Sequence, residues 1–303
     1  MKLGILTSIF GNYNFEQVLD MTSEFGLECM EVACWPQGEG ERRYAGVCHI
    51  DCENFTDEEA HTIINKCEEK KIFISALGFY ANLMDENLEK RKENIQHFMK
   101  VIDVSAKLNI NMVTGFLGRM QHKTLEENLK AVKEIWTPII DYAESKKVRI
   151  AIENCPMLFT QDEWPGGQNI MTSPDNWRKI FEILDSDYFG INYDPSHFVW
   201  QQMDYIRPLY EFKEKIFHVH FKDIKLLHDK MQDVGIMATP LQFMVPKLPG
   251  LGDVNWSKFV SALTDIGFDG PACIEIEDKS FEKTDEKIKQ AVAQATRYMK
   301  NFV

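Results

Sequence analysis

The sequence lacks the long apolar segments that membrane proteins and exported proteins carry. It contains no run of about 18 apolar residues, the minimum for a membrane-spanning helix. The apolar stretch at the N-terminus is also too short for the core of a signal peptide. We therefore expect a cytoplasmic protein with no membrane partner.

Basic residues are few relative to acidic ones. The chain has 34 lysines and arginines against 47 aspartates and glutamates, a formal net charge of -13. Proteins that bind nucleic acid need clustered positive charge, so this balance argues against such a partner. No glycine-rich phosphate-binding motif of a specific kind occurs either. A small, unphosphorylated carbohydrate is the expected substrate, and a homo-oligomer is possible.

The seven cysteines do not form a metal-binding or disulfide pattern. An odd count in a chain of 303 residues disfavours a disulfide framework. Cys29, Cys34, Cys48 and Cys52 cluster, but Cys29 and Cys34 would point to opposite faces of a strand. Buried free thiols are the expectation.

Strand-like and helix-like segments alternate along the whole chain, with no linker or low-complexity stretch between them. The expected strands are 3–7, 29–34, 72–78, 112–116, 149–153, 189–194, 216–221 and 272–276. The expected helices are 15–25, 57–70, 88–107, 125–145, 175–184, 205–214, 256–266 and 282–301. Thr56 and Ser173 are suitable N-caps for two of them. This order predicts an α/β protein, a single (β/α)8 TIM barrel over residues 1–303.

Three connections that follow expected strands are long: 36–55, 154–173 and 222–255. They would lie at the barrel face that carries active sites, as a lid and pocket wall. Polar and aromatic side chains in or beside them are candidates for binding substrate, or for packing the loops themselves. These are Trp35, His49, Trp164, Gln168, Asn169 and Lys222.

Four strand ends in the second half of the chain carry metal-binding side chains. Strand alternation places Glu153, Asp194, His220 and Glu275 on inward rows whose outward neighbours are mostly Ile, Val and Phe. A closed barrel would bring these four side chains together. Three carboxylates and one imidazole suit Mn²⁺ or Mg²⁺ and tolerate Co²⁺ or Zn²⁺. The pattern predicts one divalent cation, although separately hydrogen-bonded barrel residues would give the same pattern.

Five motifs resemble the xylose-isomerase-like sugar phosphate isomerase/epimerase family over essentially the whole chain. They are IENCPM at 152–157, YDPSH at 193–197, HVHFKD at 218–223, PGLGD at 249–253 and GPACIEIED at 270–278. The resemblance implies metal ligation by Glu153, Asp194, His220 and Glu275, with Glu277 as a rival to Glu275. It also implies that His197 binds a substrate oxygen. Leu226 stands where the epimerases carry arginine, and Lys222 or Lys225 could supply that charge.

The ligand set and the resemblance together predict an isomerase or epimerase of a sugar, keto-sugar or cyclitol. A cation that chelates a carbonyl and its neighbouring hydroxyl stabilises the enediolate left when the intervening C–H loses its proton. Glu153 and Glu275 would act as general base and general acid. Elimination is the nearest alternative, in a lyase of the inosose dehydratase or 3-keto-glycoside type. A nuclease and a non-catalytic sugar-binding protein are the alternatives from other classes.

Overall fold

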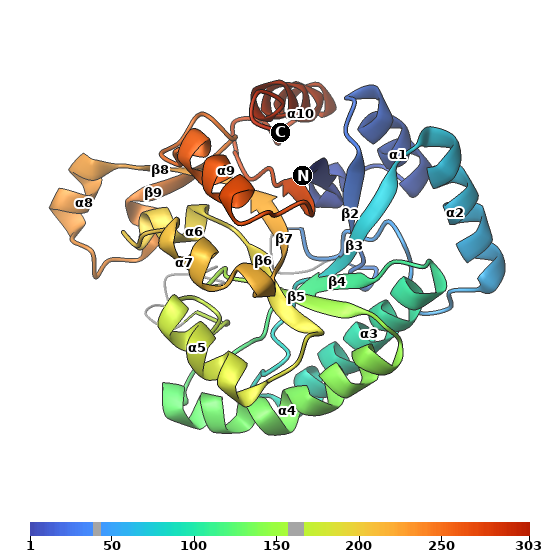
Figure 1. Ribbon diagram of the computed structural model, residues 1–303. Coiled ribbons are helices and arrows are strands. Elements are labelled where there is room, and N and C mark those ends of the chain that lie inside the picture. The colour runs from blue at the N-terminus through green and yellow to red at the C-terminus, as the bar shows by residue number, and fades with distance from the viewer. Residues whose placement is uncertain (39–43, 157–166) are drawn as a thin grey trace.

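Short β-branched and apolar runs form the parallel strands of a closed barrel (Figure 1). The computed structural model describes residues 1–38, 44–156 and 167–303. Within these residues the barrel strands are β1 Lys2–Leu6, β2 Cys29–Ala33, β3 Phe73–Phe79, β4 Met112–Gly115, β5 Arg149–Glu153, β6 Phe189–Tyr193, β7 Ile216–Phe221 and β10 Pro271–Ile274. The ring order is β1-β10-β7-β6-β5-β4-β3-β2, and β1 pairs with β2 to close it. The predicted TIM barrel is confirmed.

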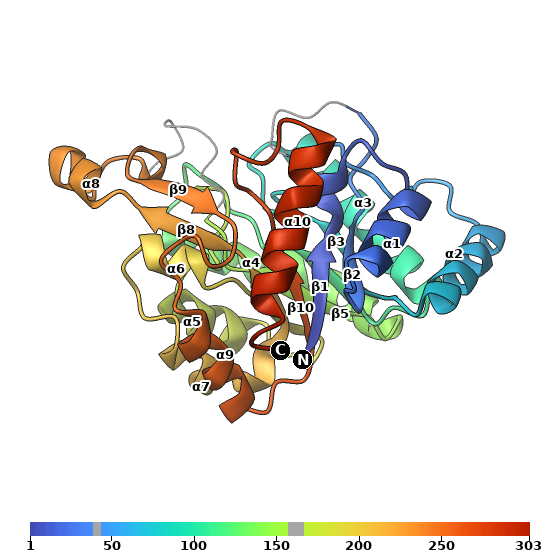
Figure 2. The same cartoon turned by 90° about the horizontal axis from the view of Figure 1, so that it is seen from above.

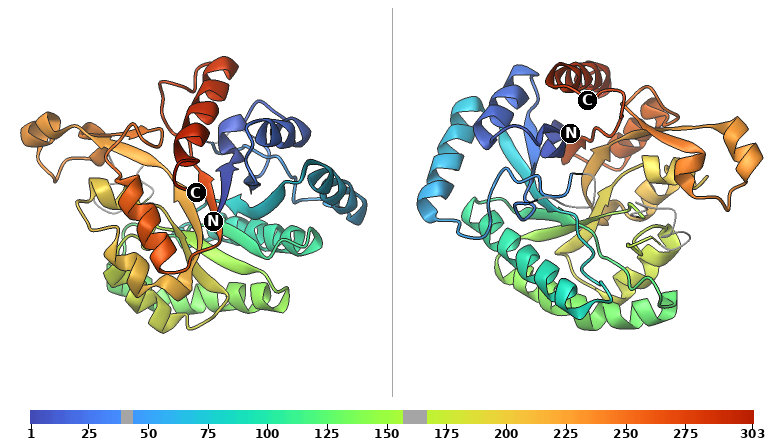
Figure 3. Two further views of the ribbon diagram at one scale, coloured as in Figure 1. Left: turned by 45° about the horizontal axis from the view of Figure 1, so that its top comes forward. Right: turned by 180° about the vertical axis from the view of Figure 1, so that it is seen from behind.

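Helices surround the barrel, as the two views in Figure 3 show. They are α1 Phe15–Glu24, α2 Asp57–Lys70, α3 Leu88–Lys107, α4 Leu125–Ser145, α5 Pro174–Ile183, α7 Arg207–Glu211, α9 Trp256–Asp265 and α10 Asp285–Met299. Both predicted N-caps are confirmed: Thr56 accepts from Glu59 N in a capping box, and Ser173 accepts from Asn176 N. Across the three described ranges, none of the helices combines the length and apolar character that crossing a bilayer would need.

The helical segments differ from the prediction in one shortened helix and in additional short turns. The segment expected to be helical over 205–214 contains only α7 and the 3-10 turn η3 Lys213–Lys215. Two short helical turns that directly follow barrel strands were not predicted: η1 Thr7–Phe10 after β1, and α6 Ser196–Trp200 after β6. Both follow strands at the active-site face, where periodicity gives no signal because the turns are only four or five residues long.

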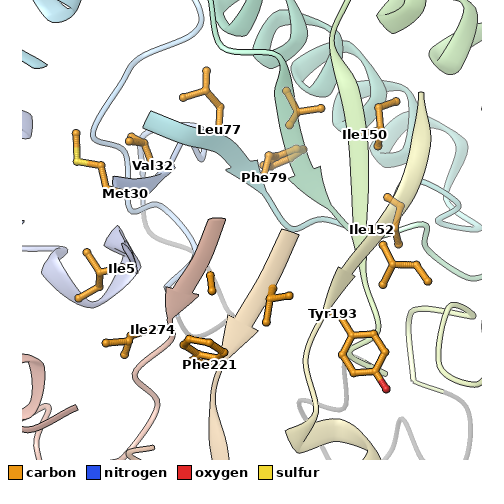
Figure 4. Close-up of a cluster of buried hydrophobic side chains, with 14 of the residues drawn as sticks. Ile5, Met30, Val32, Leu77, Phe79, Ile150, Ile152, Tyr193, Phe221 and Ile274 are labelled. Atoms are coloured by element: carbon orange, nitrogen blue, oxygen red, sulfur yellow. The ribbon is translucent and has the colours of Figure 1, made fainter. Parts of the chain in front are cut away.

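The main apolar core lies between the strands and the helices. Outward-facing side chains of the barrel strands form much of it, and Figure 4 draws them around the ring of strands. They include Ile5, Met30, Val32, Leu77, Phe79, Ile150, Ile152, Tyr193, Phe221 and Ile274, all buried. Inside the barrel, Ala76, Met112, Ala151 and Phe217 form a separate small apolar layer. The alternation predicted for strand 149–153 is therefore present, with Ala151 inward and Ile150 and Ile152 outward.

The N-terminal cysteines behave as predicted. Cys29, Cys34 and Cys52 are buried, Cys48 is half-buried, and all four are free thiols. Burial raises the pKa of the Cys48 thiol to about 12. These side chains pack as small apolar groups.

The expected connection 222–255 contains secondary structure of its own. β8 Asp223–Leu226 pairs antiparallel with β9 Met244–Lys247, and α8 His228–Val234 and η4 Pro240–Gln242 lie between them. This hairpin projects away from the barrel beside the active-site face (Figure 2). Each of its strands has only four residues, and β9 contains Pro246, which explains why the sequence pattern did not predict them.

Asp223 holds the base of this hairpin in place. Its buried carboxylate accepts hydrogen bonds from the backbone N–H groups of Gly250, Gly252 and Val254 at 2.9, 3.3 and 3.1 Å. It also accepts from Trp256 Nε1 at 2.9 Å. One side chain therefore satisfies donors from the PGLGD turn and from the first turn of α9.

We predict that Asp223→Ala lowers the free energy of unfolding by about 2–4 kcal/mol, because several buried donors lose a charged acceptor together. Urea denaturation followed by circular dichroism measures the change. Asp229→Ala removes an exposed carboxylate of α8 and serves as the matched control, with an expected change below about 0.5 kcal/mol. Equal effects of the two substitutions would contradict this role for Asp223.

Candidate metal centre and active site

The barrel brings the four predicted ligands to one point at the carboxyl ends of its strands. Glu153 is the last residue of β5, Asp194 follows β6, His220 lies in β7 and Glu275 follows β10. Each offers one ligand atom, and these atoms all lie within 4.8 Å of one another. All four residues are buried. Glu277 is outside this group, so the geometry favours Glu275 over its rival as a ligand.

Neighbouring polar groups fix the orientation of Asp194. Asn154 Nδ2 donates to the Asp194 carbonyl at 2.9 Å, and Asp194 N donates to Asn154 Oδ1 at 2.7 Å. These two bonds join the ends of β5 and β6. Ser196 N donates to Asp194 Oδ1 at 2.7 Å, which occupies that oxygen and leaves Oδ2 facing the other ligands.

The four ligand atoms share a property that suits a bound cation. Among the described residues, Glu153 Oε1, Asp194 Oδ2, His220 Nδ1 and Glu275 Oε2 are buried and make no well-aligned hydrogen bond. Their close polar neighbours are one another, His197 and Lys222. Buried polar atoms without well-aligned hydrogen bonds are costly, so their convergence calls for an electropositive group at the centre. Three carboxylate oxygens and an imidazole nitrogen fit a hard divalent cation.

The ammonium group of Lys222 lies against the same carboxylates. Its Nζ is 3.1 Å from Asp194 Oδ2, 3.2 Å from Glu275 Oε2 and 3.8 Å from Glu153 Oε1. Lys222 is itself buried. Burial lowers its pKa, but Glu275 and the neighbouring carboxylates raise it more, so the pKa lies well above its ordinary value. Without a bound cation, the Lys222 ammonium and the imidazoles of His197 and His220, whose pKa values are raised, offset the charge of the three carboxylates.

The two glutamates have opposite pKa shifts. Burial raises the pKa of Glu153, but Lys222 and the two histidines outweigh it and hold that pKa well below its ordinary value. Burial and the neighbouring Glu153 charge raise the pKa of Glu275 despite Lys222. Glu153 is therefore the carboxylate and Glu275 the group that more readily holds a proton. Such a division is typical of paired acid and base catalysts.

His197 lies beside the ligands and presents a donor to them. Trp200 Nε1 donates to His197 Nδ1 at 3.4 Å. His197 Nε2 lies 3.2 Å from Asp194 Oδ2 and 3.4 Å from Glu153 Oε1. Because Nδ1 accepts from the indole, the ring proton sits on Nε2 and faces the site. This arrangement suits the predicted contact with a substrate oxygen.

A cavity of about 640 Å³ opens above these residues. Its floor includes Glu153, His197, Lys222 and Glu275. Its walls come from the first long connection, the η4 and β9 segments of the hairpin, and the residues after β10. Among the described wall residues are Trp35, Tyr44, Tyr80, Phe116, Trp200, Pro240, Met244 and Glu277. Trp35 thus lies where the sequence places it, whereas Trp164 lies outside the described residues.

Two other residues predicted to bind substrate, His49 and Asn169, make hydrogen bonds to other protein groups instead. His49 is buried, its Nδ1 lies 2.9 Å from Thr7 Oγ1, and its Nε2 lies 3.1 Å from the Phe10 carbonyl. Burial lowers its pKa. His49 is not among the described residues that line the cavity. Its contacts favour a role in holding the first long connection in place. A contact between His49 and substrate stays a prediction. Asn169 donates to the carbonyls of Glu153 and Cys155, which packs its loop.

Sequence reasoning missed Glu31, which contacts His220 from the opposite side of the barrel. Glu31 Oε2 lies 2.6 Å from His220 Nε2. Burial raises the pKa of Glu31, but His220 outweighs it and lowers that pKa to about 2. Trp200, in the cavity wall, was also missed. A charged residue inside the apolar run Cys29–Ala33 was the available signal for Glu31.

We predict that Mn²⁺ stabilises the protein through these four ligands. At a free concentration of about 100 times Kd, the melting temperature should rise by about 5 °C. Asp194→Asn keeps the acceptor for Ser196 N but removes a ligand charge, and it should abolish the rise. Differential scanning calorimetry measures both, with Asp229→Asn as control. An unchanged rise in Asp194→Asn would exclude Asp194 as a ligand.

Metal binding should also depend on pH. Burial lowers the pKa of His220, but Glu31, Glu153 and Glu275 raise it well above its ordinary value in the metal-free protein. A cation must displace that proton, so the affinity should rise by about tenfold per pH unit while the imidazole is protonated. Calorimetric titration in buffers of different ionisation enthalpy counts the proton released. Affinity that is constant from about pH 6 to 8 would argue against this linkage.

Comparison of sequences identifies relatives of the whole chain and of part of it. The uncharacterized protein YfiH of Bacillus subtilis (strain 168) is 21% identical over 323 residues, covering 97% of this chain and 100% of that protein. Inosose dehydratase of Clostridium perfringens is 27% identical over 105 residues, covering 33% and 34% of the two chains.

Solved structures share the fold. The IolI protein with a bound zinc atom matches with a TM-score of 0.73 and 19% identity, covering 100% of this chain and 99% of that chain. D-psicose 3-epimerase with D-fructose matches with a TM-score of 0.71 and 15% identity, with the same coverage. The family model described as xylose isomerase-like TIM barrel matches residues 19–302. With nearly its whole length matched, the chain belongs to the xylose isomerase-like TIM-barrel family.

Proposed function

We propose that the protein is a divalent-metal-dependent isomerase or epimerase of a sugar, keto-sugar or cyclitol. The observation that carries this proposal is the convergence of four buried ligand atoms, without well-aligned hydrogen bonds among the described residues, at the floor of a cavity. A site for structural zinc usually contains thiolates, which this group of ligands does not. The four residues would hold the cation, and Mn²⁺ or Mg²⁺ suits them best.

A bound divalent cation supplies a Lewis acid that polarises a carbonyl and its neighbouring hydroxyl. Glu153, with its lowered pKa, is the group that takes the proton from the intervening carbon. Glu275, with its raised pKa, is the group that returns a proton. Return to the opposite face of the same carbon epimerises the substrate, and return to the neighbouring carbon isomerises it.

Two cationic or donor groups complete the proposed site. His197 Nε2–H donates to a substrate oxygen, because its Nδ1 is occupied by Trp200. The Lys222 ammonium stabilises negative charge that develops on the substrate oxygens, since it lies within 3.2 Å of two ligand carboxylates. Lys222 also supplies a positive charge in the absence of the arginine that epimerases carry at the position of Leu226. Leu226 itself lies in β8, where its N–H donates to Asp253.

The cavity walls suit a carbohydrate ring. Trp35 lies in the wall with its ring 5.0 Å from that of Phe79, an edge-to-face contact that fixes the indole. Aromatic faces stack on the C–H faces of sugars, and the carboxylates and His197 below provide polar contacts. The likeness to D-psicose 3-epimerase supports a substrate of this kind.

The test is proton exchange at the carbon next to the carbonyl. We predict that the Mn²⁺-loaded protein, incubated in D2O with a panel of ketoses and inososes, replaces that C–H by C–D in at least one compound, as followed by NMR. Glu153→Gln should slow the exchange by about 10²–10⁴-fold. Glu144→Gln, an exposed position on α4, is the matched control. Exchange that persists in Glu153→Gln or after chelation would exclude this mechanism.

A lyase of the same family is the second candidate. The stretch that matches inosose dehydratase supports it, as does the Lys222 ammonium, 3.2 Å from Glu275, which can donate a proton to an expelled oxygen. Elimination begins with the same proton abstraction, so exchange alone does not separate the two reactions. NMR of the products separates the two reactions. An epimer or isomer keeps all the atoms of the substrate, whereas a dehydration product has lost one water.

A further inference from the structure

A carboxylate outside the proposed ligand set reaches His220 across the barrel interior. Glu31 is on β2 and His220 is on β7, and β1 and β10 lie between these strands in the ring. Neither side chain is exposed to solvent. Glu31 Oε2 lies 2.6 Å from His220 Nε2, the ring nitrogen that points away from the other three ligands.

The other oxygen of Glu31 is held by two hydroxyl groups. Thr114 Oγ1 in β4 donates to Glu31 Oε1 at 2.6 Å, and the hydroxyl of Tyr80, which follows β3, donates to the same oxygen. Gly78 provides the space, because a Cβ there would lie 2.9 Å from Glu31 Oε1 and 3.1 Å from Thr114 Oγ1. Groups from β3 and β4 therefore fix this carboxylate of β2 in one position.

The contact determines which nitrogen of His220 faces the site. An ionised carboxylate oxygen at 2.6 Å accepts a hydrogen bond, so Nε2 carries the ring proton. Asn192 Nδ2 also lies 3.0 Å from Nε2, but an amide nitrogen cannot accept that proton, and it lies 3.2 Å from the Tyr80 hydroxyl. In the neutral ring the lone pair is then on Nδ1, which lies 3.0 Å from Glu275 Oε2 and 3.6 Å from Glu153 Oε1.

The second histidine of the site has the reverse arrangement. An acceptor behind His220 leaves a lone pair facing the ligands, whereas a donor behind His197, the indole of Trp200, leaves an N–H facing them. A lone pair can bind a cation and an N–H cannot. The different partners behind the two rings thus distinguish a ligand from a hydrogen-bond donor.

We propose that Glu31 is the positioning residue that makes His220 a metal ligand through Nδ1, by accepting a hydrogen bond from Nε2–H. This inference rests on the metal site of the proposed function. Glu31 contacts no substrate; it acts by orienting the ring and raising the basicity of the ligating nitrogen. Carboxylates behind ligating histidines typically change metal affinity by about 10–100-fold.

The first test needs no substitution of Glu31. In the Zn²⁺-loaded protein labelled with [15N]histidine, long-range 1H–15N correlations report which nitrogen of each ring carries the proton. The His220 signals are identified by their loss in His220→Asn. A proton on Nε2 and a metal-shifted Nδ1 are expected. A proton on Nδ1, with metal at Nε2, would overturn the proposal.

The second test measures Mn²⁺ affinity by calorimetric titration at fixed pH. Glu31→Gln keeps the size of the side chain but removes its charge, and Kd should rise by about 10–100-fold. Ser75→Ala is the matched control. Ser75 is buried in the same interior, and its side-chain hydroxyl contacts His218 and Cys273 rather than Glu31 or His220 in the described part of the chain, so Kd should change by less than about twofold.

The outcomes separate this inference from the proposed function. If the wild-type protein binds no divalent cation, the proposed function itself is wrong. A wild-type protein that binds Mn²⁺, with an unchanged Kd in Glu31→Gln, would overturn the role of Glu31 alone. If Glu31→Gln fails to fold, as judged by circular dichroism, the histidine measurement on the wild-type ring decides the question.

Discussion

The pairing of β1 with β10 closes the sheet, and the geometry of the site depends on that closure. Residues 2–5 lie in register with 271–274, so the last strand returns to the first. In an open sheet, side chains at the ends of β2 and β7 would be separated by the width of several strands. In the closed ring they meet across the interior, where Glu31 contacts His220.

Closure also places like charges close together away from water. Glu153, Asp194 and Glu275 are buried, with ligand atoms within 4.8 Å of one another and of that of His220, and Lys222 supplies a nearby ammonium. Folding must offset this repulsion elsewhere, and the extensive apolar layer between strands and helices provides the stabilisation. Active sites typically contain charged groups whose repulsion lowers the stability of the folded protein.

Local sequence patterns were sufficient to predict the barrel and the four side chains that converge at its end. Alternation of inward and outward side chains is a property of each strand by itself, so Ala151 and Glu153 could be assigned to one face and Ile150 and Ile152 to the other. The ends of parallel strands necessarily share one face of a barrel. Four strand ends bearing Glu, Asp, His and Glu therefore predicted one cluster.

Local sequence patterns do not predict the contacts behind the four converging side chains. Glu31 and His220 are 189 residues apart, and nothing in either strand indicates which side chain faces it across the ring. The β8–β9 hairpin likewise has strands too short to give a periodic signal, and Asp223 holds it through donors about 30 residues away. Sequence alone determined the barrel strands, their inward faces and which four side chains converge, because these follow from local periodicity. Tertiary structure decided which nitrogen of His220 faces the site and what forms the cavity wall, because both depend on contacts between distant segments.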